Sequence, residues 1–170
     1  LGTTKAAEPG DGGFQGQVLV APGGEESAGD GTGTAGAETV ALETEDPQSL
    51  YRQATQNAVD RQYAAAEQGF STFLQKYPEH SLAGAAQYWL GETYYAQGDY
   101  RTAAQNFLKG YQDYPKSRRA PDSLLKLGLS LKKMGEKERA CASLSAVSSE
   151  FPNAVDAKKR AQIEFRRTGC

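Results

Sequence analysis

The chain contains few residues of the types that carry out catalysis or bind metals. His80 is the only histidine among the 170 residues, and it lies in a Tyr-Pro-Glu-His-Ser turn, where a histidine is usually a solvated surface residue. Cys141 and Cys170 do not have the spacing of metal ligands, although they permit one disulfide. The sequence also lacks a phosphate-binding loop, a nucleophile elbow and paired histidines. We therefore expect no enzyme activity, no cofactor and no metal site.

Charge is distributed unevenly along the chain. Residues 1–46 carry a net charge of −8, whereas residues 47–170 carry a net charge of +6. Short basic clusters occur at residues 118–119, 132–133 and 158–160, but they fall on different turns and helix faces. We interpret these clusters as solvated helix faces and expect no binding to nucleic acid.

Residues 1–46 have the composition of a flexible, acidic, Gly-rich linker. Eleven of the 19 glycines precede residue 37, and such segments have little apolar surface to bury. Residues 14–20 could pair as a strand, although an isolated strand is not stable in water. No apolar run approaches the roughly 20 residues of a membrane span. The chain begins at Leu1 without a targeting segment, so we expect that any signal peptide has been removed.

A repeat follows the linker. Asp46-Pro47 predicts a helix start, because aspartate caps the free amides of a first turn and proline is tolerated there. Further along the chain, Pro78, Pro115 and Pro152 each follow an aromatic residue and lie 37 residues apart. Other positions keep the same period, namely Ala66, Ala103 and Ala140; Phe70, Phe107 and Leu144; and the Leu-Gly pairs at 90–91 and 127–128.

Each repeat unit has the pattern of two amphipathic helices. In the second unit, apolar residues recur at helical spacing over residues 85–97 and again over residues 100–113. Gly98 ends the first of these helices and Asp99 caps the next. Small residues such as Gly91 and Ala103 allow the two backbones to approach closely. The pattern therefore predicts helical hairpins.

These units resemble the tetratricopeptide repeat, whose signature places Leu-Gly, an aromatic, Ala, Phe and Pro at fixed offsets. The first unit keeps only its second half, since Gln53 and Ala54 replace Leu-Gly. The second unit matches with Leu90, Gly91, Tyr94, Ala103, Phe107 and Pro115, and the third with Leu127, Gly128, Leu131, Ala140, Leu144 and Pro152.

The resemblance implies an all-α fold, a tetratricopeptide-type helical hairpin solenoid over residues 47–170. We expect three repeats, at about 47–80, 81–117 and 118–152. A C-terminal capping helix follows at about 153–168, with Asn153 as its cap and basic residues on its outer face.

Tetratricopeptide repeats bind partners in a concave groove lined by the first helix of each hairpin. The usual groove positions correspond here to Gln48, Arg52 and Thr55 in the first unit, Tyr88, Glu92 and Tyr95 in the second, and Leu125, Leu129 and Lys132 in the third. Packing in the core is the alternative for the two leucines. Trp89 is expected to pack in the core between hairpins.

Residues 87–95, 98–100 and 121–128 give a closer resemblance, to the Tol-Pal system cell division coordinator family of Gram-negative bacteria, the CpoB or YbgF type. The resemblance implies a periplasmic protein–protein interaction module that binds TolA and coordinates outer-membrane constriction with septal peptidoglycan synthesis in cell division. A peptidoglycan synthase complex is a second candidate partner. A tetratricopeptide scaffold of another envelope complex, such as outer-membrane protein assembly, stays open as the alternative.

Two further expectations depend on this resemblance. Family members often carry a trimeric coiled coil, but no sustained heptad pattern occurs here, so we expect a monomer for this chain and a trimer where a coiled coil precedes it. The oxidising periplasm favours a disulfide between Cys141 and Cys170, provided that Gly169 reverses the chain.

Overall fold

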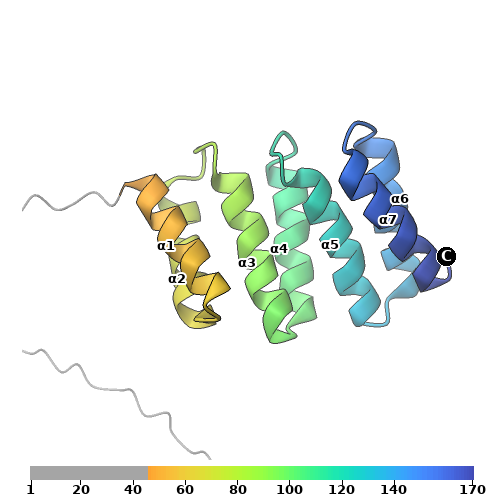
Figure 1. Ribbon diagram of the computed structural model, residues 1–170, viewed down its shortest axis with the longest axis horizontal. Coiled ribbons are helices and arrows are strands. Elements are labelled where there is room, and N and C mark those ends of the chain that lie inside the picture. The colour runs from red at the N-terminus through yellow and green to blue at the C-terminus, as the bar shows by residue number, and fades with distance from the viewer. Residues whose placement is uncertain (1–45) are drawn as a thin grey trace, which may run out of the picture. The chain divides into compact units, whose positions relative to one another are not determined.

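The computed structural model describes residues 46–170, and this part of the chain contains helices and no strands (Figure 1). The predicted linker and the candidate strand at residues 14–20 lie outside the described residues, apart from Asp46. The helices are α1 (Pro47–Val59), α2 (Tyr63–Lys76), α3 (Ala83–Gln97), α4 (Tyr100–Asp113), α5 (Ala120–Lys133), α6 (Lys137–Glu150) and α7 (Val155–Thr168).

The helix ends follow the local signals of the sequence. The Asp46 carboxylate accepts a hydrogen bond of 2.9 Å from the backbone N–H of Ser49, which starts α1. Gly98 ends α3 with a φ of 82°, a left-handed conformation that glycine adopts without steric cost. The carboxylate of Asp99 then accepts a hydrogen bond from Thr102 N–H at 3.0 Å and caps α4. The predicted boundary between these two helices is therefore confirmed.

Consecutive helices pack as hairpins, α1 with α2, α3 with α4, and α5 with α6, and α7 packs on both α5 and α6. Close packing depends on one small residue per hairpin. A Cβ atom added at Gly91 of α3 would lie 2.7 Å from Cδ1 of Phe107 on α4. In the first hairpin, where Ala54 replaces this glycine, a Cβ added at Gly69 of α2 would lie 2.7 Å from Cβ of Ala54. The degenerate first repeat thus keeps the close approach by moving its glycine to the second helix.

Two groups of buried side chains form the core. One group lies mainly in the first hairpin and the start of α3, and the other extends from α3 to α7. Trp89 and Tyr94 on α3 pack against both groups. Trp89 is therefore a packing residue between hairpins, in the place expected from the sequence. The prediction of an all-α hairpin solenoid is confirmed for the described residues.

The start of α7 differs from the prediction. Ala154, and not Asn153, is the N-cap residue, and no side chain caps this helix. Asn153 lies one residue earlier, in a turn closed by the hydrogen bond from Ala154 N–H to the Phe151 carbonyl at 3.0 Å. Its own carbonyl accepts a hydrogen bond from Val155 N–H at 3.0 Å. The turn geometry therefore decides which residue occupies the cap position.

Candidate partner-binding groove

The first helix of each hairpin lies beside the first helix of the next hairpin. Contacts join α1 to α3, α3 to α5, and α5 to α7. Figure 1 shows α3, α5 and α7 following one another along the described part of the chain. We call the shared surface of these four helices the first-helix face. In stacked helical hairpins, such a continuous surface is suited to binding an extended partner.

A cluster of aromatic and charged side chains joins α3 to α5 on this face. The carboxylate of Glu92 is 2.7 Å from Nζ of Lys126, and both side chains are largely buried. The same ammonium group lies 4.7 Å from the centre of the Tyr95 ring, a cation–π geometry. Tyr100 packs edge-on against Tyr95, with ring centres 5.1 Å apart. Burial, together with Tyr100 and Glu92, raises the pKa of Tyr95, so its hydroxyl stays protonated and can donate a hydrogen bond.

A hollow of about 290 Å³ lies between α5 and α7. It has an apolar floor of Leu125, Leu129 and Ile163, and a charged rim of Arg160, Glu164 and Arg167. Such a combination of apolar floor and few charged groups is common in binding sites.

Glu164 connects the two sides of this hollow. Its carboxylate accepts hydrogen bonds from Lys132 of α5 at 3.1 Å and from Arg167 of α7 at 2.9 Å. Burial alone would raise the pKa of Glu164, but these two cationic partners outweigh it and lower the pKa below its ordinary value. The carboxylate therefore stays ionised near neutral pH and ties α7 to α5.

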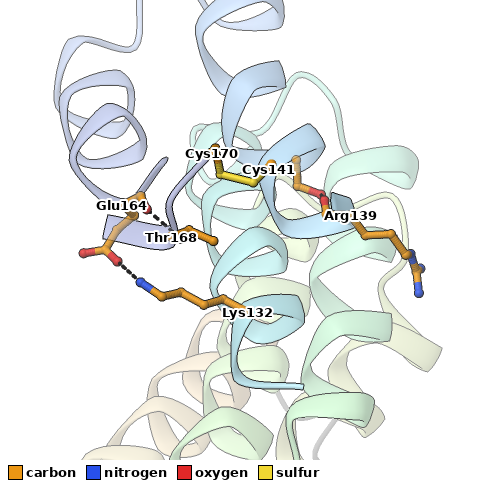
Figure 2. The surroundings of a disulfide bond; sticks show 7 residues. Lys132, Arg139, Cys141, Glu164, Thr168 and Cys170 are labelled. Carbon is orange, nitrogen blue, oxygen red and sulfur yellow. Dashed lines mark hydrogen bonds and ion pairs between the residues drawn. A yellow bond between two sulfur atoms is a disulfide. The ribbon is translucent and has the colours of Figure 1, made fainter. Parts of the chain in front are cut away.

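A disulfide holds the end of α7 (Figure 2). Cys141 on α6 and Cys170 are joined, with their Cα atoms 5.7 Å apart and a sequence separation of 29. Gly169, with a φ of 76°, reverses the chain after α7, and Cys170 N–H donates to the Phe165 carbonyl at 3.2 Å. Figure 2 shows Glu164 and Thr168 on α7, shortly before this reversal, with Lys132 of α5 beside Glu164. The disulfide and the Glu164 contacts thus both hold the C-terminal end of α7.

Most of the predicted groove residues lie on the first-helix face, but two of them are buried in the core. Tyr88 is 7% exposed, because its ring packs against Phe107 and the guanidinium group of Arg119 covers it at 5.0 Å. Burial raises the pKa of Tyr88 far above its ordinary range. Leu125 is 1% exposed and contributes only to the floor of the hollow. These two residues are corrected from groove-lining to core positions.

The other predicted residues divide between two places. Gln48, Arg52 and Thr55 lie on α1, where Arg52 donates to the Ser49 hydroxyl and the Thr55 hydroxyl donates to the Tyr51 carbonyl. Beyond α1, all four residues are half-buried: Glu92 and Tyr95 on α3 both contact Lys126, whereas Leu129 lines the hollow and Lys132 is paired with Glu164 at its rim.

The sequence did not identify the contribution of α7 to this face. Arg160 and Arg167 were interpreted as part of a solvated outer surface, yet they rim the hollow. Arg160 also lies 3.5 Å from the carboxylate of Asp122 on α5. The repeat pattern assigns no groove position to these two residues, because α7 begins after the last full hairpin. The sequence also did not identify Lys126, because its contacts with Glu92 and Tyr95 depend on how α3 packs beside α5.

Comparisons with known proteins agree with this architecture. A family model described as Tetratricopeptide repeat matches residues 85–117 and 122–154. Two curated proteins from Pseudomonas putida, each described as Cell division coordinator CpoB, are 51% identical to the chain over 39 residues. The matched segment covers 23% of this chain and 15% of each relative.

Within residues 46–170, no helix combines the length and apolar character needed to cross a membrane. The hairpins at residues 85–117 and 122–154 match tetratricopeptide repeats, and a 39-residue segment of the chain is similar to the two CpoB proteins.

Proposed function

We propose that this protein is a periplasmic interaction module of the Tol-Pal system, which binds a TolA-like protein and coordinates outer-membrane constriction with septal peptidoglycan synthesis. The name of the two similar Pseudomonas putida proteins, Cell division coordinator, supports a role in division. The motif at residues 87–95 supports the same family. A peptidoglycan synthase complex would then be recruited through the same protein.

The observation that carries this proposal is the hollow between α5 and α7 beside the Tyr95 cluster. Leu129 and Ile163 offer an apolar floor, and Arg160 and Arg167 have side chains that are 55% and 69% exposed. Glu164 in the rim is paired with Lys132 and Arg167, and Asp122 lies 3.5 Å from Arg160, so three cationic groups face two carboxylates. The rim therefore has excess positive charge, which suits a partner segment with an apolar anchor flanked by acidic residues.

Isothermal titration of the full 170-residue chain with the periplasmic part of TolA tests this proposal. Tyr95→Ala should weaken binding about thirtyfold, because truncating a central aromatic residue commonly costs roughly 2 kcal/mol. Leu129→Ala should weaken it as well, and a higher salt concentration should slow association. Circular dichroism should show unchanged helix content for both variants.

Gln105→Ala is the matched control, since Gln105 is exposed on α4, a second helix. We expect this variant to bind like the unaltered protein. If Tyr95→Ala and Leu129→Ala both bind normally while second-helix variants do not, the partner uses the other face and the groove assignment is wrong. An absence of any heat of binding would reject TolA as the partner.

A further inference from the structure

The second helices of the first two hairpins border a cavity that the proposed function does not use. It has a volume of about 570 Å³ and lies between the first two hairpins, where α2 and α4 flank the turn before α3. We call it the α2–α4 cavity. Leu74, Glu79 and His80 line one side, and Gln87, Asp113 and Tyr114 line the other. Its volume falls within the range of roughly 300 to 1,000 Å³ that is usual for ligand pockets.

Comparison with the next repeat explains why this space is open. Tyr111 stands 37 residues after Leu74, and its hydroxyl donates a hydrogen bond to Glu150 on α6. The Tyr111 ring also packs edge-on against Phe151, with ring centres 6.2 Å apart. Leu74 is shorter and has no hydroxyl, so it cannot make the equivalent bridge to α4. Leu74 therefore leaves open a space that the bridge of Tyr111 spans in the next repeat.

An amide side chain lies in the wall of the cavity. Gln87 is 3% exposed, and its Nε2 donates to the side-chain oxygen of Asn106 at 2.8 Å and to its carbonyl at 3.3 Å. In the part of the chain that the structure describes, no donor is recorded for its Oε1. The residue 37 positions later, Leu124, is an ordinary core leucine. Gln87 therefore places an amide acceptor in the cavity wall where the next repeat has an apolar side chain.

The remaining polar groups add negative charge to this site. Glu79 and Asp113 bring two carboxylates, and Lys109, 2.7 Å from Asp113, balances one of them. His80 accepts the backbone N–H of Leu82 through Nδ1 at 3.1 Å, which leaves its Nε2 as a donor. The wall thus offers mainly acceptors and one excess negative charge, beside the apolar surfaces of Leu74 and Tyr114.

From this arrangement, we infer that the α2–α4 cavity binds an arginine side chain of a partner protein. A guanidinium group presents five N–H donors in one plane, enough for the Gln87 oxygen and a carboxylate together. The three-carbon stem of arginine can pack along the apolar surfaces of Leu74 and Tyr114 while its guanidinium group donates hydrogen bonds to the acceptors. The cavity is therefore a second partner site, bordered by the second helices of the first two hairpins, and it selects a basic segment.

Nuclear magnetic resonance of the ¹⁵N-labelled full chain tests this inference with N-acetyl-arginine methylamide as the probe. We expect saturable shifts of the Gln87 side-chain amide and of the backbone amides of Glu79 and Asp113, with a dissociation constant on the order of 1 mM. The citrulline analogue has nearly the same shape but no charge, and should bind at least about tenfold more weakly. The lysine analogue should also bind more weakly, because it lacks the planar fork.

Two variants separate binding at the cavity from general effects. Leu74→Tyr copies the residue of the next repeat and should abolish the shifts by filling the space. Gln87→Leu copies Leu124 and should weaken binding at least about tenfold by removing the acceptor. Tyr95→Ala, on the first-helix face, should bind the probe normally, so this test is independent of TolA binding. No saturable shift at Gln87, equal binding of the citrulline or lysine analogue, or normal binding by Leu74→Tyr would each overturn the inference.

Discussion

Arg61 occupies a backbone conformation that favours glycine. It lies in the turn between α1 and α2 with a φ of 61°. Gly98 and Gly135 occupy the equivalent turns of the next two hairpins, 37 and 74 residues later, with φ values of 82° and 79°. A side chain with a Cβ in this region costs roughly 1 kcal/mol relative to glycine. The first hairpin therefore contains local strain that the other two avoid.

We predict that Arg61→Gly raises the free energy of unfolding by about 0.5 to 1 kcal/mol. The added chain entropy of glycine in the unfolded state offsets part of the strain relief, which keeps the gain modest. Urea unfolding followed by circular dichroism measures it. Gly98→Ala is the reciprocal variant and should lower the free energy of unfolding by about 1 kcal/mol. A less stable Arg61→Gly variant would show that the arginine side chain contributes more than its backbone costs.

Helix α7 closes the array without a hairpin partner of its own. Only two of its residues, Ala157 and Ala161, are buried, and both have small side chains, whereas Phe165 is half-buried against the core. The ion pair between Lys132 and Glu164 adds a partly exposed contact, which contributes modestly to stability. The Cys141–Cys170 disulfide adds a covalent link to these contacts at the C-terminal end of the helix.

We predict that the oxidised protein has no reactive thiol and that the double variant Cys141→Ser/Cys170→Ser is less stable by roughly 3 to 4 kcal/mol. The closed loop of 29 residues sets this magnitude on the chain-entropy model. Thiol titration of the unreduced, unfolded protein checks the bond, and urea unfolding checks the stability. Two reactive thiols per chain would reject the disulfide. Hydrogen exchange should show the loss of protection mainly in α7.

At the scale of the whole described region, α3 connects two groups of core side chains. Trp89 and Tyr94 pack against both groups, so the first hairpin and the later hairpins share these two residues. In an array of stacked repeats, stability comes from each unit together with its interface to the next unit. The cooperativity of unfolding between the two groups should therefore depend on α3.

We predict that Trp89→Ala lowers the free energy of unfolding by roughly 2 to 3 kcal/mol, less than for a fully buried tryptophan because this side chain is half-buried. The amides of α1 and α2 should then lose hydrogen-exchange protection well before those of α5 and α6. The variant Leu108→Ala, at a half-buried α4 residue that packs against the second group alone, is the comparison. Uniform loss of protection in Trp89→Ala would show that the two groups do not unfold separately.

Much of the fold follows from signals that act over a few residues. Asp46 starts α1, Gly98 ends α3 and Asp99 caps α4, because each uses a backbone preference or a hydrogen bond within one helical turn. The spacing of the prolines and of the small residues then determines the hairpin repeat. These features do not depend on how neighbouring hairpins pack, so the sequence by itself determines them.

Tertiary structure alone decided which side chains the surfaces offer. Tyr88 and Leu125 occupy the same helical register as exposed groove residues, and their burial depends on Arg119, Phe107 and the packing of α5. The hollow between α5 and α7 and the α2–α4 cavity are spaces between elements that are far apart in sequence. Helical periodicity determines the direction in which a side chain points from its helix axis. The distance to the neighbouring helix, however, depends on the side chains of both helices, and this distance decides whether a residue is buried or exposed.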